Sequence, residues 1–208
     1  MAGYPSRLSM VMRMKNTITI SLTTITSDRD GPGHERLSSQ DPVQRWILMD
    51  TRIRDYGPLD EQPVVELSLR AWAPVFSSLA QVLGPEIFVR LHGDWRQYQE
   101  KDVRDTLADD TTRVWVAEAA RGVVGFVAAK LHPERQIGEI WMLAVDPDEQ
   151  GRGIGTALTE VATGWLREAG MTLAMVETGG DSGHAPARRV YEKAGYTLLP
   201  VARYFKAL

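Results

Sequence analysis

The chain has 208 residues, 43% apolar content and a formal net charge of −3, enough for one ordinary domain with a sizeable core. It contains no cysteine. That excludes a disulfide framework, a thiol nucleophile and thiolate metal sites, and it suits a reducing, cytoplasmic compartment. No apolar run approaches the roughly 18 residues of a membrane span. A mildly acidic chain without a basic stripe is also a poor candidate for nucleic-acid binding.

The charge is divided unevenly along the chain. Residues 1–48 carry a net charge of +2 and the remaining residues a net charge of −5. Residues 1–45 lack a convincing periodic pattern, so we expect a disordered or loosely structured leader over residues 1–48 and a domain over residues 49–208. The acidic domain would favour the approach of a cationic ligand.

The first elements of the domain follow from periodicity and capping residues. Residues 53–56 read as a strand, and Asp60 as an N-cap. Apolar spacing predicts a helix over residues 64–83, which Pro74 should kink or divide. A second helix is predicted over residues 95–107.

Strands dominate the middle of the chain. Residues 113–118 and 123–130 predict an antiparallel hairpin. Residues 139–145 are an apolar run headed by an acid, typical of a strand buried on both faces. A helix running to Gly170 and a strand over residues 172–177 follow.

The last elements are a loop, a helix and a strand pair. Residues 179–183 predict a flexible glycine-rich loop, and residues 186–194 a helix with Gly195 just past its end. Residues 196–199 and 202–207 predict a closing strand pair. The whole order predicts an α/β fold with a mixed, mostly antiparallel sheet flanked by helices on both faces.

A polar turn and a glycine-rich loop, residues 151–155, connect the central strand to its helix. This arrangement suits phosphate binding, because the first amides of a helix lack partners and glycines allow close approach. The spacing is Gly151-x-Gly153-x-Gly155, without the G-x-G-x-x-G or P-loop pattern.

The stretch resembles motif A of the GNAT superfamily of N-acetyltransferases, whose Q/R-x-x-G-x-G/A signature is present as Gln150, Gly153 and Gly155. The resemblance implies that loop amides bind the pyrophosphate of coenzyme A and that the preceding strand pairs with its pantetheine arm. The residues assigned in this way are Leu143, Ala144, Val145, Gln150, Gly151, Arg152, Gly153, Ile154, Gly155 and Thr156.

A second resemblance lies in the helix that follows. Its sequence is similar to motif B of the same family, with Ala187, Tyr191, Glu192, Lys193 and Gly195 in the expected places. His184 stands where the family most often has Asn beside the cofactor, and we assign it to cofactor binding. The two motifs extend the resemblance over residues 50–208 and imply a GNAT-type fold.

The resemblance also implies catalytic roles. Tyr191 is the candidate acid that protonates the departing thiolate. Glu139 is the candidate base. It lies eleven positions before Gln150, which is the spacing of the catalytic glutamate in the histone-type members of this family. Strand alternation would place it on the same face as Trp141, Leu143 and Val145. A solvated Glu139, with water taking the proton, stays an alternative, and Glu177 is a candidate substrate ligand or second base.

Trp72 and Phe76 are candidate walls of the acceptor pocket, with core packing as the alternative. Arg188 and Arg189 are assigned to a solvated face, with contact to the coenzyme's 3′-phosphate as the alternative, and no metal-ligand spacing emerges. The sequence therefore predicts an acetyl-CoA-dependent N-acetyltransferase acting on a primary amine of a small molecule or peptide. A non-catalytic acyl-CoA sensor, another acyl donor and a hydroxyl acceptor stay open. A homodimer is compatible with this interpretation.

Overall fold

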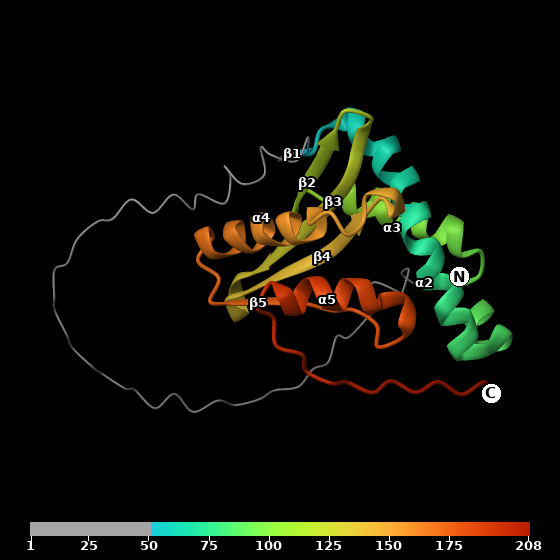
Figure 1. The fold of residues 1–208 in the computed structure, drawn as a ribbon. Helices are drawn as coiled ribbons and strands as arrows, with labels where there is room; N and C mark the ends of the chain where they lie inside the picture. Colours follow the sequence, from blue (N-terminus) through green and yellow to red (C-terminus); the bar gives the residue numbers. More distant parts are fainter. Residues whose placement is uncertain (1–50) are drawn as a thin grey trace, which may run out of the picture.

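The computed structural model describes residues 51–208. The predicted leader, and the start of the domain at Met49, lie outside these residues. The strands are β1 (Thr51–Asp55), β2 (Thr112–Ala119), β3 (Gly122–His132), β4 (Ile137–Val145) and β5 (Leu173–Val176). The α-helices are α2 (Glu61–His92), α3 (Trp95–Leu107), α4 (Ile154–Glu168) and α5 (Ala185–Lys193), and η1 to η4 are single 3-10 turns (Figure 1).

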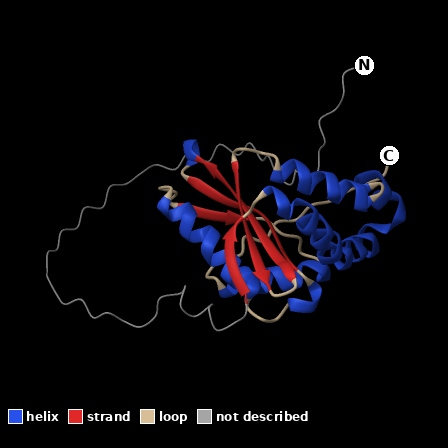
Figure 2. Cartoon of the chain, turned by 90° about the horizontal axis from the view of Figure 1, so that it is seen from above, coloured by secondary structure: helices blue, strands red, loops and turns tan. Residues whose placement is uncertain are grey.

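The five strands form one sheet in the order β1-β2-β3-β4-β5. All neighbours are antiparallel except β4 and β5, which are parallel. Figures 1 and 2 show helices on both sides of the sheet. The predicted α/β class, with its mixed, mostly antiparallel sheet, is confirmed.

Each face of the sheet buries its own apolar core. On one face, Val65 of α2 and Val103 of α3 pack against Phe126 of β3. On the other face, Leu158 and Leu166 of α4 pack against Val127. Burial of these faces supplies the main stabilisation of the fold, and it fixes α4 and its preceding loop against the end of β4.

Helix α2 differs from the prediction. Its backbone stays helical through Pro74 and departs from helical angles at Gly84, where φ is 72° and ψ is 163°. The backbone angles show no division at Pro74, and the break at Gly84 instead falls directly after Leu83, the predicted end of this helix. Glycine adopts positive φ without penalty, and Pro85 is tolerated in the first turn of the helix that resumes after it.

Strand β4 contains a bulge that overturns the predicted alternation. Ala129 of β3 pairs with Ile140 and Ala128 pairs with Met142, so Trp141 has no partner in β3. Beyond the bulge the faces are exchanged. Leu143 therefore packs in the α4 core, while Trp141 packs in the α2–α3 core.

Glu139 pairs with Lys130, whose Nζ lies 4.3 Å from the centroid of the Trp141 ring. Directly opposite residues point to the same face, so Glu139 belongs to the α2–α3 face together with Trp141. The prediction that Glu139 shares a face with Leu143 and Val145 was wrong, because strict alternation does not cross a bulge.

The segment after α5 also differs from the prediction. Residues 197–208, which we name the C-terminal tail, contain no strand, so the predicted closing strand pair is wrong. The two segments of that pair would be joined by Pro200 and Val201. Tight hairpin turns need residues that accept positive φ, and neither proline nor valine does.

Candidate active site

The glycine-rich loop places a row of unengaged backbone amides at the N-terminus of α4. Gly151 and Gly153 have φ of 79° and 85°, values that other residues adopt at a cost. Within residues 51–208, no backbone amide from Gly151 to Thr156 donates a hydrogen bond. Unpaired amides combined with the positive end of the helix dipole form an anion-binding site.

Arginine side chains surround this loop. Arg152 contacts Glu149 at 2.7 Å while its side chain is 63% exposed, and Arg121 contacts Glu149 at 3.0 Å. Arg70 pairs with Asp146 at 2.8 Å. These ion pairs hold the turn between β4 and the loop, and they place positive charge near the free amides.

The two parallel strands separate before they reach the loop. Their last paired residues are Ile140 and Val176, whereas β4 continues to Val145. The edge of β4 that faces β5 is therefore open over residues 141–145. An open strand edge can accept an extended ligand through main-chain hydrogen bonds. At the end of β4, the side chain of Gln150 donates a hydrogen bond from Nε2 to the Val145 carbonyl at 3.2 Å.

Two residues assigned to cofactor binding, Ile154 and Gly155, also take part in packing. The Ile154 side chain is buried in the α4 core, so only its backbone faces the loop. A Cβ atom on Gly155 would lie 3.4 Å from Val190 of α5. The lack of a side chain there allows α5 to approach α4 closely, and this approach fixes the position of Tyr191.

Tyr191 lies on α5 with its side chain almost sealed from solvent. The residue is 8% exposed, and burial, together with the nearby Tyr196, raises the pKa of the Tyr191 phenol well above its ordinary value. Its hydroxyl makes no hydrogen bond with any described residue and still retains contact with solvent. At neutral pH Tyr191 is therefore protonated and has a proton available for donation.

Glu139 lies at the start of β4, paired with a residue that the sequence analysis did not assign. The Nε2 atom of His132, at the end of β3, lies 2.8 Å from Oε2 of Glu139. The Glu139 side chain is 12% exposed. The imidazole fixes one carboxylate oxygen and leaves the other for a ligand.

Glu177 follows β5 on the same face of the sheet. Burial and the neighbouring charge of Glu139 raise the pKa of Glu177, and Arg203 of the C-terminal tail acts in the opposite direction. Two carboxylates close enough to influence each other form an acidic patch beside the gap between β4 and β5. Such a patch favours a cationic ligand.

Hydrogen bonds hold the loop before α5, residues 179–183, while its predicted flexibility stays a prediction. The Asp181 carboxylate accepts hydrogen bonds from the Gly183 amide and from the His184 ring. Arg188 donates to the carbonyls of Gly179 and Asp181, so Arg188 is not a freely solvated residue. With its ring held by Asp181, the role of His184 toward a cofactor stays a prediction.

The two aromatic residues assigned to the acceptor pocket lie in α2. Phe76 is 5% exposed and stacks on Trp95 of α3 with 4.6 Å between ring centroids. Trp72 is half-buried and lies 6.3 Å from the ring of Phe126. Trp72 packs between α2 and the sheet, whereas Phe76 packs between α2 and α3. The contact of either side chain with a substrate stays a prediction.

These positions test whether the chain fits coenzyme A. Free amides at a helix start suit a pyrophosphate, the open β4 edge suits an extended amide-bearing arm, and Tyr191 lies on the same side of the sheet as α4. The residues present therefore fit the group. The contacts of His132, Arg188 and Arg203 were missed because strand register and loop folding create them, and no motif in the sequence marks them. Among residues 51–208 no group of three metal-ligating side chains occurs, and no helix is long and apolar enough to cross a membrane.

The fold and the site define an α/β protein with a mixed sheet, a separating parallel strand pair, a glycine-rich loop with free amides and a buried tyrosine. The sequence matches the family model described as the acetyltransferase (GNAT) family over residues 78–196, more than half of the chain. The chain belongs to the GNAT acetyltransferase family.

Curated relatives named mycothiol acetyltransferase match most of the chain. The protein from Saccharomonospora viridis is 30% identical over 78% of this chain and 52% of its own length. That from Thermomonospora curvata is 33% identical over 76% of this chain and 53% of its own length. The chain thus spans about half the length of these relatives.

Solved structures show the same fold. A mutant form of the BH1408 protein from Bacillus halodurans superimposes with a TM-score of 0.58 at 16% identity, covering 76% of this chain and 99% of that one. A putative GNAT acetyltransferase from Desulfovibrio desulfuricans gives 0.53 at 21% identity over 72% and 87%. These similarities support the fold and not a substrate.

Proposed function

We propose that this chain is an acetyl-CoA-dependent N-acetyltransferase that moves an acetyl group to a primary amine by direct attack. The observation that carries the proposal is the run of free amides from Gly151 to Thr156, placed beside the open edge of β4 and on the Tyr191 side of the sheet. The names of the curated relatives favour a small-molecule acceptor over a peptide.

The proposed reaction uses the two faces of the sheet for its two substrates. Acetyl-CoA would bind on the α4–α5 side, and the amine would enter on the α2–α3 side, where Glu139 and Glu177 lie. The thioester carbonyl would then lie in the gap between β4 and β5. The β4 bulge, which leaves Trp141 unpaired, supplies a candidate backbone donor for the carbonyl oxygen.

Proton transfers complete the reaction. Glu139, directly or through water, would accept a proton from the incoming ammonium. The neutral nitrogen would attack the carbonyl carbon, and the carbon–sulfur bond would break. Tyr191 would donate its proton to the departing thiolate. No enzyme nucleophile is required, in agreement with a sequence that lacks cysteine.

The phosphate-loop assignment predicts the effect of Gly153→Val. Acetyl-CoA should stabilise the folded state of the unaltered chain by about 2.7 kcal/mol at a hundredfold excess over Kd. The melting temperature should rise accordingly. A branched side chain at a residue with φ of 85° should distort the loop, block phosphate approach and remove this shift. The measurement is thermal unfolding with and without acetyl-CoA.

Gly164→Val is the matched control, because a Cβ atom on Gly164 of α4 meets nothing within 4 Å. It should leave the stability of the free protein unchanged or slightly higher, because valine has a better helix propensity than glycine, and it should keep the acetyl-CoA shift. An undiminished shift in Gly153→Val would remove the loop from its proposed role.

We also propose that residues 1–48 are a leader and that the domain begins at Met49. A chain beginning at Met49 should then fold and show the same acetyl-CoA shift as the full chain, because β1 begins at Thr51 and completes one edge of the sheet. Circular dichroism and thermal unfolding measure both properties. Insolubility or loss of the shift on truncation would show that residues 1–48 complete the domain.

A cytoplasmic location and a homodimer stay proposals of the same kind. Cell fractionation tests the location, and we expect the protein in the cytosolic fraction.

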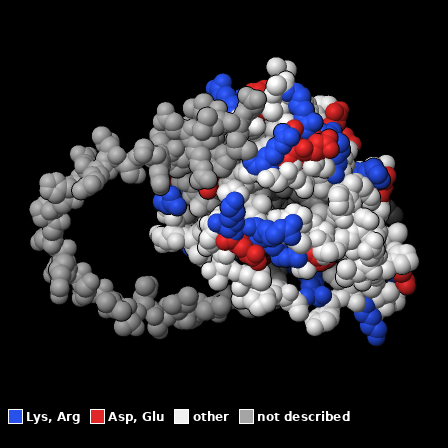
Figure 3. All heavy atoms as spheres, viewed as in Figure 1, with Lys and Arg blue, Asp and Glu red and all other residues white. Residues whose placement is uncertain are grey.

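On the face shown in Figure 3, basic and acidic side chains are interspersed rather than gathered in a stripe of one sign.

A further inference from the structure

The carboxylate of Glu139 is held by one of its two oxygens. Its Oε2 atom lies 2.8 Å from Nε2 of His132, the last residue of β3. Its Oε1 atom makes no hydrogen bond with any residue among 51–208 and still retains contact with solvent. An ionised carboxylate only accepts hydrogen bonds, so Nε2 carries the hydrogen of this contact. One oxygen is therefore fixed, and the other is available to receive a proton.

The register of β3 and β4 brings the two side chains together. His132 pairs with Ile137, and Lys130 pairs with Glu139. His132 is thus a diagonal neighbour of Glu139 on the same face of the sheet, a position from which long side chains reach each other. Because backbone pairing on both strands sets this position, the ring is presented to the carboxylate by the sheet itself.

The residue directly opposite Glu139 is kept away from its carboxylate. Lys130 forms its ion pair with Asp109, at 2.8 Å, and its Nζ lies 4.3 Å from the centroid of the Trp141 ring. A permanent ammonium beside a carboxylate favours the ionised form and weakens the carboxylate as a proton acceptor. An imidazole can orient a carboxylate without adding a permanent charge. The contact with His132 is therefore the one that suits a base.

His132 and the proposed acceptor site lie on opposite sides of Glu139. Glu139 pairs with Met175 of β5, and Glu177 comes two residues later, on the same face. Glu139 thus lies between His132 on the β3 side and the gap between β4 and β5 on the other side. Its side chain is 12% exposed, against 35% for that of His132. The imidazole holds the carboxylate from the side that an amine entering the gap would not use.

We propose that His132 is a positioning residue for acetyl transfer. Its Nε2–H group holds Oε2 of Glu139 and thereby aims Oε1 at the acceptor nitrogen. In that step an N–H bond of the ammonium breaks, the proton binds to Oε1, and the electron pair stays on nitrogen for attack on the thioester. His132 keeps its own proton throughout. This inference rests on the proposed function, because it assigns a partner to the proposed base.

Two substitutions at His132 separate the N–H group from the ring. His132→Phe keeps a planar ring and removes the donor, and it should lower kcat by roughly 10- to 10²-fold, the scale of misplacing a catalytic group. The acetyl-CoA thermal shift and the KM for acetyl-CoA should not change. His132→Gln restores an N–H donor of similar reach and should recover kcat to within a few-fold. Steady-state kinetics with an accepted amine, together with thermal unfolding, measures these effects.

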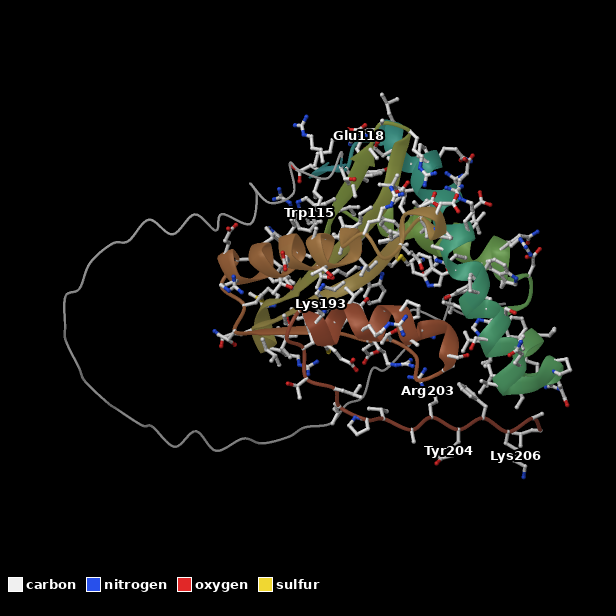
Figure 4. The ribbon with its side chains drawn as sticks, in the orientation of Figure 1. Trp115, Glu118, Lys193, Arg203, Tyr204 and Lys206 are labelled. Atoms are coloured by element: carbon white, nitrogen blue, oxygen red, sulfur yellow. The ribbon has the colours of Figure 1, made fainter. Side chains whose placement is uncertain are left out.

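Glu118→Gln is the matched control, because it alters another polar contact between strands of this sheet. The Glu118 carboxylate accepts a hydrogen bond of 3.0 Å from Nε of Arg54. Glu118 pairs with Val123 at the start of β3, whereas His132 ends that strand, and Figure 4 shows Glu118 close to the β2–β3 turn. The control should leave kcat unchanged. A loss equal to that of His132→Phe would overturn the proposal, because it would make the loss a general effect on the sheet.

A double-mutant cycle tests whether His132 acts through Glu139. Added to Glu139→Gln, which has no base to position, His132→Phe should lower kcat by no more than about twofold further. An equal loss in both backgrounds would mean that His132 acts independently, and would overturn the proposal. Unaffected turnover in Glu139→Gln alone would overturn the base assignment and this proposal together. A slow Glu139→Gln with a fully active His132→Phe would overturn this proposal alone.

NMR of the chain labelled with ¹⁵N-histidine gives a readout that does not depend on activity. The His132 signals are assigned by their absence in His132→Gln. The expected result is a proton on Nε2 of His132, with a signal that moves in Glu139→Ala, which removes the acceptor. A proton on Nδ1 alone, or a signal indifferent to Glu139→Ala, would show that the contact is not formed as proposed and would overturn the inference.

Discussion

Tyr191→Phe should lower the turnover of acetyl transfer by roughly 10²-fold or more, the usual scale for losing a general acid. The substitution keeps the ring that is packed on α5 and removes only a hydroxyl that makes no hydrogen bond within residues 51–208. The acetyl-CoA thermal shift should therefore stay as it is while kcat falls. Steady-state kinetics with an accepted amine, combined with thermal unfolding, separates the two effects.

Tyr196→Phe provides the matched control. It removes a hydroxyl that is bonded to Thr163, at a distance of 2.9 Å, and that takes no part in the proposed chemistry. It should lower stability by about 0.5–1.5 kcal/mol and leave kcat within a few-fold. Unchanged activity in Tyr191→Phe would contradict the acid assignment.

Glu139→Gln should lower the rate by about 10²-fold near neutral pH, and the loss should shrink as pH rises. The reason is that a base is needed only while the acceptor arrives as ammonium, and an alkyl ammonium loses its proton unaided near its pKa of about 10. The amide keeps the shape of the side chain and its contact with His132. The measurement is kcat/KM across pH for both chains.

Glu177→Gln is the comparison for this variant. Burial and the charge of Glu139 raise the pKa of Glu177, which makes Glu177 the second candidate for the base. If Glu177→Gln shows the pH-dependent loss and Glu139→Gln does not, the base role passes to Glu177. A loss in Glu139→Gln that is constant across pH would instead give Glu139 a binding or structural role.

Features encoded locally could be predicted from the sequence. Helix α3 has the predicted bounds because Asp94 caps it, accepting hydrogen bonds from the amides of Arg96 and Gln97. Gly195 ends α5 with φ of 86°, as its position indicated. The glycine-rich loop follows its strand and begins its helix because the glycines permit positive φ there.

Features that depend on tertiary contacts could not be predicted. The β4 bulge at Trp141 results from pairing with β3 and reverses the faces of the strand beyond it. His132 and Glu139 meet only because the β3–β4 register brings them together. The order of the loop before α5 depends on Ser78 of α2, whose hydroxyl accepts a hydrogen bond from Gly183 at 3.1 Å.

The C-terminal tail shows a different limit. Residues 196–199 and 202–207 predicted two strands, but strand propensity requires a partner strand and a turn to become structure. Pro200 and Val201 do not provide the turn, and the described chain does not provide the partner. The pattern was therefore wrong about the conformation of this segment.

Transfer of an isotope-labelled acetyl group tests the proposed function directly. The full chain is incubated with acetyl-CoA carrying ¹³C in its acetyl group and with a panel of small primary amines, and the products are analysed by mass spectrometry and NMR. The expected result is labelled acetyl on an amine nitrogen, with free thiol released in equal amount and both products reduced in Tyr191→Phe. Saturable acetyl-CoA binding without a labelled product from any amine would indicate a sensor, and label on a hydroxyl oxygen would indicate O-acylation; either would contradict N-acetyltransferase function.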